Sequence, residues 1–174
     1  MKDNNYFTDS EQSCYNKFIT WQRQTKFFDE YGRFQKGHWA DASGYTDEEL
    51  IYNVELKERD QILCKSGKVS GATYKEDTIV IESHKVADLL WDCILEGKKP
   101  WYMNFLHNDV VILFDLTKVG HPKKRRINAK SKGYGNTEAD YRFFLPLKYA
   151  AIWKNGKLVK KMGEEWNYEG MCEC

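Results

Sequence analysis

The sequence of 174 residues has no long hydrophobic run and almost no net charge. No stretch approaches the roughly 20 consecutive apolar residues that a membrane-spanning helix needs, which excludes the common class of helical membrane proteins. Residues 1–5 lack the apolar segment of a secretory signal, so we expect a cytoplasmic protein with no membrane partner. The formal net charge of +1 means that bulk charge does not indicate a polyanion-binding protein.

Cysteine is too sparse for a disulfide-rich fold. Three of the five cysteines, Cys14, Cys64 and Cys93, occur singly among apolar neighbours, which is typical of buried, reduced thiols. Cys172 and Cys174 form a Cys-x-Cys pair near the end of the chain, but no further metal ligand is nearby in the sequence. We therefore expect a frayed C-terminal tail.

Several motifs of known chemistry are also missing. The chain has no glycine-rich phosphate loop and no obvious pair of nucleophile and base. Its four histidines show no metal-ligand spacing: His38, His84, His107 and His121. Nucleotide-binding P-loop proteins, hydrolases with a nucleophilic triad and histidine-based zinc sites are not indicated.

The apolar content is sufficient for one α/β domain. Hydrophobic residues make up 41% of the chain and aromatic residues 15%. The length suits a single domain at 1–174, with a core at about 9–118 and a basic loop and C-terminal extension at 119–174. Apolar spacing predicts a helix from Asp9 or Ser10 that ends before Gly32. Further along, the patterns predict strands at 50–59, 78–82, 101–106, 110–116, 141–153 and 157–161, a helix at 84–97, and a long mobile loop at 60–77.

Positive charge is concentrated in one segment. Residues 121–132 carry six Lys and Arg and no acid, whereas residues 163–174 carry four Glu and no base. A run of this kind can contact a phosphodiester backbone, although a solvated loop is an equally good interpretation. The candidate nucleic-acid-binding residues are Lys123, Lys124, Arg125 and Arg126.

The strand at 50–59 has chemistry on one of its faces. Its two-residue period places Glu55 and Lys57 together, opposite Val54 and Leu56. A carboxylate can bind Mg²⁺, and an ammonium nearby can orient an attacking water or stabilise charge on phosphorus. Asp41 is the natural second carboxylate because a hairpin can bring it beside Glu55. The closer acids Asp47, Glu48 and Glu49 fall where the turn should be and are expected to face solvent.

Glu-x-Lys alone is a common pair, but its context resembles the PD-(D/E)xK, or restriction-endonuclease-like, nuclease superfamily. Asp41 precedes the strand YNVELKER at 52–59, and IVIESHK follows at 79–85, where a strand passes into a helix. The order is similar to that of small phage-type or resolvase-like members over about residues 9–118. Ala40 stands where that pattern has proline.

The resemblance implies a mixed central β-sheet flanked by helices, with a C-terminal β extension. It implies a divalent-metal-dependent nuclease acting on DNA, with Mg²⁺ or Mn²⁺ bound by Asp41 and Glu55 and with Lys57 as the catalytic lysine. It allows a homodimer. Glu11, Glu82 and Lys85 are weighed as further contacts, against ordinary roles at the starts of helices.

Two other classes of function stay open. A catalytically inactive nuclease-fold protein could use the same cleft as a nucleic-acid-binding or protein-interaction module. An interaction protein could instead use exposed aromatic residues at Trp101, Trp153 and Trp166.

Overall fold

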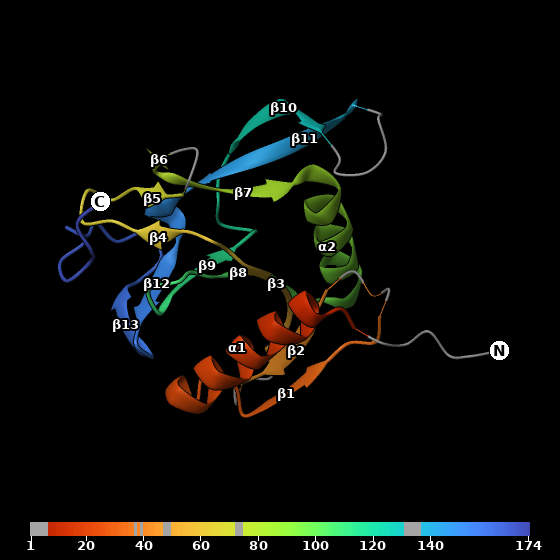
Figure 1. Cartoon of the computed structure of the whole chain (residues 1–174). Helices are drawn as coiled ribbons and strands as arrows, with labels where there is room; N and C mark the ends of the chain where they lie inside the picture. Colours follow the sequence, from red (N-terminus) through yellow and green to blue (C-terminus); the bar gives the residue numbers. More distant parts are fainter. Residues whose placement is uncertain (1–6, 37, 39, 47–49, 72–74, 131–136) are drawn as a thin grey trace.

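A seven-stranded sheet forms the centre of the molecule (Figure 1). The computed structural model describes residues 7–36, 38, 40–46, 50–71, 75–130 and 137–174. The strand order is β1-β2-β3-β8-β9-β12-β13. The bounds are Glu30–Arg33 for β1, Ala42–Tyr45 for β2, Ile51–Glu58 for β3, Lys99–Phe105 for β8, Val110–Asp115 for β9, Ala151–Lys154 for β12 and Lys157–Lys160 for β13. Because β3 pairs with β8 in parallel and the other neighbours pair antiparallel, the predicted mixed sheet is confirmed.

Two helices lie on opposite faces of this sheet, as predicted. Helix α1, Asp9–Thr25, contributes Phe18 and Trp21 to a buried cluster with Val54 and Leu56 of β3. Helix α2, Ser83–Glu96, contributes Leu89 and Cys93 to a second cluster on the other face, with Tyr102 of β8. The alternation along β3 therefore works as the sequence predicts: even-numbered residues face α1, and Asn53 and Glu55 face α2.

The helix bounds differ from the prediction in detail. Thr8, rather than Asp9 or Ser10, is the N-cap of α1, because its hydroxyl and the Glu11 carboxylate form a capping box. Helix α1 ends at Thr25, before Gly32 as predicted, and Gly32 itself lies inside strand β1. Helix α2 ends as predicted, with Gly97 in the left-handed conformation that favours glycine. Ile94, near the end of α2, is 70% exposed although it is apolar.

The predicted basic loop is instead a strand. β10, Lys123–Lys130, pairs antiparallel with β11, Thr137–Pro146, and β11 pairs with β7, Thr78–Glu82. Pro122 and the cations suggested irregular chain, but aromatic residues on β11 accept the cations: Lys124 lies over the Tyr141 ring and Arg125 over the Phe144 ring. We call this three-stranded sheet the basic ribbon.

The prediction of a mobile loop at 60–77 is also wrong for the part of that segment that the structure describes. It contains the short strands β4, Ile62–Leu63, β5, Val69–Ser70, and β6, Lys75–Glu76, which form a small sheet. Leu63 and Val69 are fully buried, and this burial fixes the segment. Cys64 is neither reduced nor alone, because it forms a disulfide with Cys174, so the predicted frayed tail is wrong as well.

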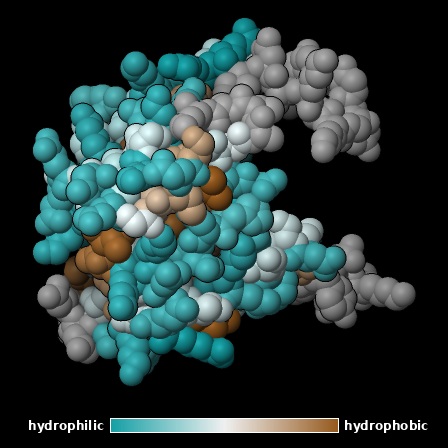
Figure 2. Space-filling model, turned by 60° about the vertical axis from the view of Figure 1, so that its left-hand side comes forward, coloured by the Kyte–Doolittle hydropathy of each residue, from teal (hydrophilic) through white to brown (hydrophobic). Residues whose placement is uncertain are grey.

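The exposure of three tryptophans argues against the alternative of an interaction protein with an exposed aromatic surface. Trp101 and Trp153 are only 6% and 7% exposed, and Trp166 is half-buried, so these three residues do not form an exposed aromatic surface. The face shown in Figure 2 is largely hydrophilic, with hydrophobic residues in small patches. In the described part of the chain, neither helix combines the length and the apolarity that crossing a membrane requires.

Candidate active site

Asp41 is held beside β3 by its backbone and its side chain. It directly precedes β2, where Ala42 pairs with Val54. The Asp41 amide donates to the Val54 carbonyl over 3.0 Å, and the Leu56 amide donates to Asp41 Oδ2 over 2.8 Å. These two bonds bracket Glu55, so the structure brings Asp41 next to Glu55 as predicted. The alternative acids Asp47, Glu48 and Glu49 lie outside the described residues.

Glu55 is a buried carboxylate, with only 4% of the residue exposed. Burial, and then the negative charge of Asp41, raise its pKa to about 7. Lys85 of α2 opposes this shift, because its ammonium forms an ion pair with Glu55 Oε1. Against the effect of burial, the same pair raises the pKa of Lys85.

Lys57 and Lys85 lie in a polar pocket of about 260 Å³ between α1, β3 and α2. Lys57 is half-buried and projects from the same face of β3 as Glu55. The pocket is lined by Ser10, Glu11, Cys14, Tyr15, Arg33, Asp41, Leu56, Lys57, Glu58 and Lys85. The predicted trio of Asp41, Glu55 and Lys57 is therefore gathered at one place, with Glu55 behind the pocket and the other two at its wall.

Glu82 and Glu11 have separate positions at this site. Burial acts to raise the pKa of Glu82, but its own backbone amide and the charges of Lys57 and Lys85 prevail and lower it. Glu82 therefore belongs to the electrostatic neighbourhood of the pocket. Glu11 lines the pocket but its carboxylate accepts bonds from the Thr8 amide and hydroxyl, as expected of a helix-capping residue.

The two carboxylates at this site, Asp41 and Glu55, suit Mg²⁺ better than a metal ion that needs several protein ligands. In the ranges that the structure describes, no cluster of three or more His, Cys, Asp or Glu is arranged to hold a metal. Mg²⁺ needs less than that, because it commonly takes one or two carboxylates and fills its remaining positions with water and substrate phosphate. A buried glutamate with a second carboxylate beside it fits that requirement, and Asp41 and Glu55 would be the ligands.

Lys85 is a residue that the sequence suggests but does not assign. Its signal is its position after the strand-to-helix junction at Glu82 and Ser83, where the first turn of α2 meets β3. The two-residue period puts Arg59 on the strand face of Glu55 and Lys57 but assigns it no role. Arg59 donates to Asn104, Tyr102 and Val80 and ties the end of β3 to the basic ribbon. The sequence gives no sign of Arg142, which pairs with Glu82 across the strands.

The four predicted nucleic-acid contacts are exposed on β10. They are not part of the pocket that holds Asp41 and Lys57. Lys123 and Arg125 occupy alternate positions from Lys124 and Arg126, so they project from opposite faces of the ribbon.

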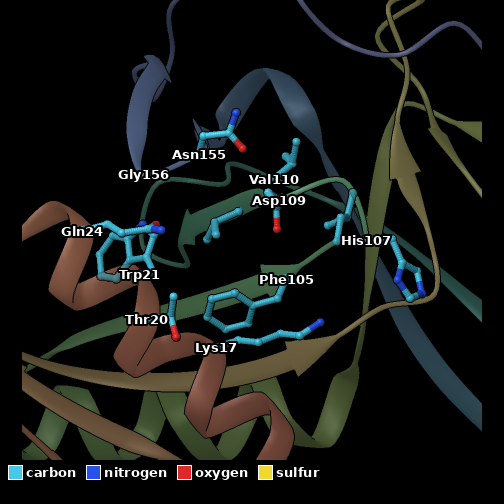
Figure 3. A pocket seen from close by; sticks show the side chains of 12 residues that line it. Lys17, Thr20, Trp21, Gln24, Phe105, His107, Asp109, Val110, Asn155 and Gly156 are labelled. Carbon is cyan, nitrogen blue, oxygen red and sulfur yellow. The ribbon is translucent and has the colours of Figure 1, made fainter.

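A second pocket, of about 280 Å³, lies between α1 and the turns that join β8 to β9 and β12 to β13 (Figure 3). Thr20, Trp21 and Gln24 of α1 form one side, and Asp109 and Asn155 of two turns form the other. Two of its polar groups are already paired: Lys17 binds Glu58 over 2.6 Å, and His107 binds Asp60 over 2.7 Å. It has no pair of neighbouring carboxylates and is not our candidate site.

Comparison with solved structures gives a similarity in fold. The Holliday junction resolvase of Archaeoglobus fulgidus, an archaeal hyperthermophile, aligns with 79% of this chain and 84% of its own chain, with a TM-score of 0.46 and 10% sequence identity. No protein-family model and no curated protein matches the sequence.

Proposed function

We propose that this protein is a divalent-metal-dependent nuclease that hydrolyses phosphodiester bonds of DNA. The observation that carries the proposal is the buried Glu55 beside Asp41, with Lys57 on the same face of β3 at a polar pocket. A buried carboxylate next to another carboxylate is costly unless a cation is there to balance the charges. A divalent metal ion would supply that balance, in addition to the Lys85 ammonium that pairs with Glu55.

Each residue would have a distinct role. Asp41 and Glu55 would hold one or two Mg²⁺ or Mn²⁺ ions. When bound, the metal would supply the positive charge that lowers the pKa of an attacking water and stabilises the leaving oxygen. Lys57 would orient that water or neutralise charge that develops on the phosphoryl group. The Leu56 amide would keep the Asp41 carboxylate in place.

A second candidate is a catalytically inactive nuclease-fold protein that binds nucleic acid or a protein. One observation favours it: Lys85 already neutralises Glu55 without a metal. The two candidates differ in their response to metal. An inactive binding module would show no stabilisation by Mg²⁺ or Mn²⁺ and would bind nucleic acid equally well in EDTA.

Thermal unfolding with and without metal tests the proposed site through Asp41→Asn. Asparagine can still accept the bond from the Leu56 amide, so the fold should survive. Without metal the variant should be as stable as the wild type or slightly more stable, because a like charge beside Glu55 is gone. Millimolar Mg²⁺ or Mn²⁺ should raise the melting temperature of the wild type by binding linkage and raise that of the variant less.

The control is Asp115→Asn, which alters another buried carboxylate, bonded to Thr117 at the end of β9. Its metal-induced shift should equal that of the wild type. If Asp41→Asn keeps the full metal-induced rise in melting temperature, Asp41 is not a ligand. The second carboxylate would then have to be Asp47, Glu48 or Glu49.

The four cations of β10 should bind the nucleic-acid backbone. Changing Lys123, Lys124, Arg125 and Arg126 to Ala should weaken DNA binding about equally for all sequences, because phosphate contacts carry no base information. The salt dependence should flatten by about 0.9 in log–log slope for each duplex phosphate that the variant no longer neutralises. Single-turnover cleavage at saturating enzyme should stay nearly normal. Unchanged affinity and slope, measured by fluorescence anisotropy over a salt series, would make these residues an ordinary solvated surface.

A further inference from the structure

A third pocket lies between the basic ribbon and the end of β3. Its volume is about 450 Å³, and its charged lining is mostly arginine. The lining residues are Arg59, Gln61, Glu76, Val80, Arg125, Arg126, Arg142 and Phe144. We call it the arginine pocket. Four arginines and one carboxylate, Glu76, line it, and Glu76 Oε2 also accepts a bond from the Thr78 hydroxyl. The lining therefore has an excess of positive charge and favours an anion.

Arg59 forms the fixed part of this pocket. It is half-buried, and each partner that the structure shows for it is uncharged: Nε donates to Asn104 Oδ1 over 2.6 Å, and Nη2 donates to the Tyr102 hydroxyl over 2.6 Å and to the Val80 carbonyl. These bonds fix the guanidinium without cancelling its charge. A planar guanidinium held in this way is suited to a phosphate oxygen, because little side-chain freedom remains to be lost on binding.

The arginine pocket is next to the candidate active site. On the basic ribbon, Glu82 of β7 pairs with Arg142 of β11, and Arg142 pairs with Arg125 of β10. Residues paired in this way lie side by side on one face of a sheet, about 5 Å apart. The charges of Lys57 and Lys85 at the active site in turn lower the pKa of Glu82. One row of charged side chains therefore leads from the proposed catalytic lysine to the arginines.

The shape and lining of the pocket select the ligand. A volume of about 450 Å³ is in the range of sites for small molecules, and a double helix cannot enter it. A duplex would meet the exposed Arg125 and Arg126 at the rim, whereas Arg59 is half-buried. Val80 and Phe144 lie beside the guanidinium groups, and the Arg125 guanidinium covers the Phe144 ring. A positively charged groove with flat side chains, arginine guanidinium planes among them, is a combination that proteins use to bind the backbone and bases of single-stranded nucleic acid.

We propose that the arginine pocket binds an unpaired nucleotide next to the cleaved bond, so that the enzyme prefers DNA with a single-stranded segment over a closed duplex. This inference rests on the proposed nuclease function and adds its substrate class. The phosphate contacts Arg59 and Arg142 inside the pocket, Arg125 lies beside Arg142 on the same face of the ribbon, and the exposed Arg126 lies at the rim.

The test compares two DNA ligands, a hairpin duplex with a single-stranded oligothymidine tail and the same hairpin with a blunt end. Binding is measured by fluorescence anisotropy in EDTA, so that no cleavage occurs. We expect the wild type to bind the tailed hairpin about tenfold more tightly or better, which corresponds to one or two charge-assisted hydrogen bonds. The double variant R125A/R126A should lose this preference, so that its affinities for the two ligands become nearly equal.

The matched control is K123A/K124A, which removes the same charge from the same strand but no residue of the arginine pocket. It should weaken binding of both ligands by similar factors and keep the preference. Loss of the preference to the same degree in both double variants would overturn the inference. Melting temperatures close to that of the wild type would show that both variants are folded.

The wild-type result separates this inference from the proposed function. Equal affinity for tailed and blunt hairpins would overturn the arginine pocket as a single-strand site and leave the nuclease proposal standing. No measurable binding of either ligand, in EDTA or with a divalent metal present, would overturn both.

Discussion

Replacing Glu55 by glutamine is expected to abolish Mg²⁺-dependent cleavage of plasmid and single-stranded DNA. The substitution keeps the size of the side chain and its capacity to accept a hydrogen bond, but it removes the charge that would hold the metal. A metal ion contributes several kcal/mol to stabilising the transition state, so the single-turnover rate should fall about a thousandfold or more. Metal binding, measured by calorimetry or by the metal-induced shift in melting temperature, should weaken markedly in the same variant.

Lys57→Ala separates the metal from the cation beside it. The variant should lose about a hundredfold or more in rate while it keeps near-normal metal binding, because Lys57 acts on the water or the phosphoryl group. Both variants should fold, since Gln at position 55 can still form hydrogen bonds and Lys57 lies at the pocket wall. Asp115→Asn is the control for a buried carboxylate outside the site and should cleave normally. Full activity in either Glu55→Gln or Lys57→Ala would remove that residue from the proposed machinery.

The position of this trio could be predicted because it depends on short-range patterns. The two-residue period of β3 alone places Glu55 and Lys57 on one face and Val54 and Leu56 on the other. Asp41 required one further step, the β2–β3 pairing. The antiparallel register of Ala42 with Val54 brings the residue before β2 to the level of Glu55. Hairpins of this kind are local in sequence and follow from turn and strand signals.

Lys85 could not be assigned because its contact depends on how a helix crosses the sheet. Thirty residues separate it from Glu55, and the ion pair exists only because β3 and β8 are parallel neighbours joined through α2. The sequence can place Lys85 in the first turn of a helix. It cannot specify the rotation of that helix about its axis, which is set by the packing of Leu89 and Cys93.

The sequence also did not predict strand β10 or the Cys64–Cys174 disulfide, because both depend on segments that meet only in the folded chain. β10 has the composition of a solvated loop, and it becomes a strand because aromatic residues of β11 cover its cations and β7 completes the sheet. Cys64 and Cys174 are 110 residues apart. Their pairing follows from the path of the C-terminal tail, where Cys172 forms a β-bridge with Cys64, and no local pattern encodes that path.

Lys85→Met should destabilise the metal-free protein at pH 8 and leave it little changed at pH 5. Burial and Asp41 raise the pKa of Glu55 to about 7, from 4.5 in an unfolded chain. A carboxyl with a raised folded pKa favours the folded state most below its unfolded pKa, and this contribution is lost as pH rises through the folded pKa. In the wild type, Lys85 offsets part of that loss by pairing with ionised Glu55. The variant cannot do this, so its stability should fall more steeply above pH 7.

The expected loss at pH 8 is about 1–2 kcal/mol, less than for a fully buried pair because Lys85 is partly exposed to solvent. For a protein of this size that is a drop of about 3–8 °C in melting temperature. Mg²⁺ should then stabilise the variant more than the wild type, because the lysine no longer competes with the metal for the carboxylates.

The double variant E55Q/K85M completes the test. With neither charge present, the stability difference between pH 5 and pH 8 that comes from this pair should disappear, and the double-mutant cycle should give a coupling energy at pH 8 but almost none at pH 5. Two results would contradict this role of Lys85: a Lys85→Met variant with the pH profile of the wild type, or one that Mg²⁺ stabilises no more than the wild type. Either would show that the Lys85 ammonium does not neutralise Glu55 in the absence of the metal. The Lys85–Glu55 ion pair would then contribute little, and the negative charge of the two carboxylates would have to be neutralised by the metal and Lys57 alone.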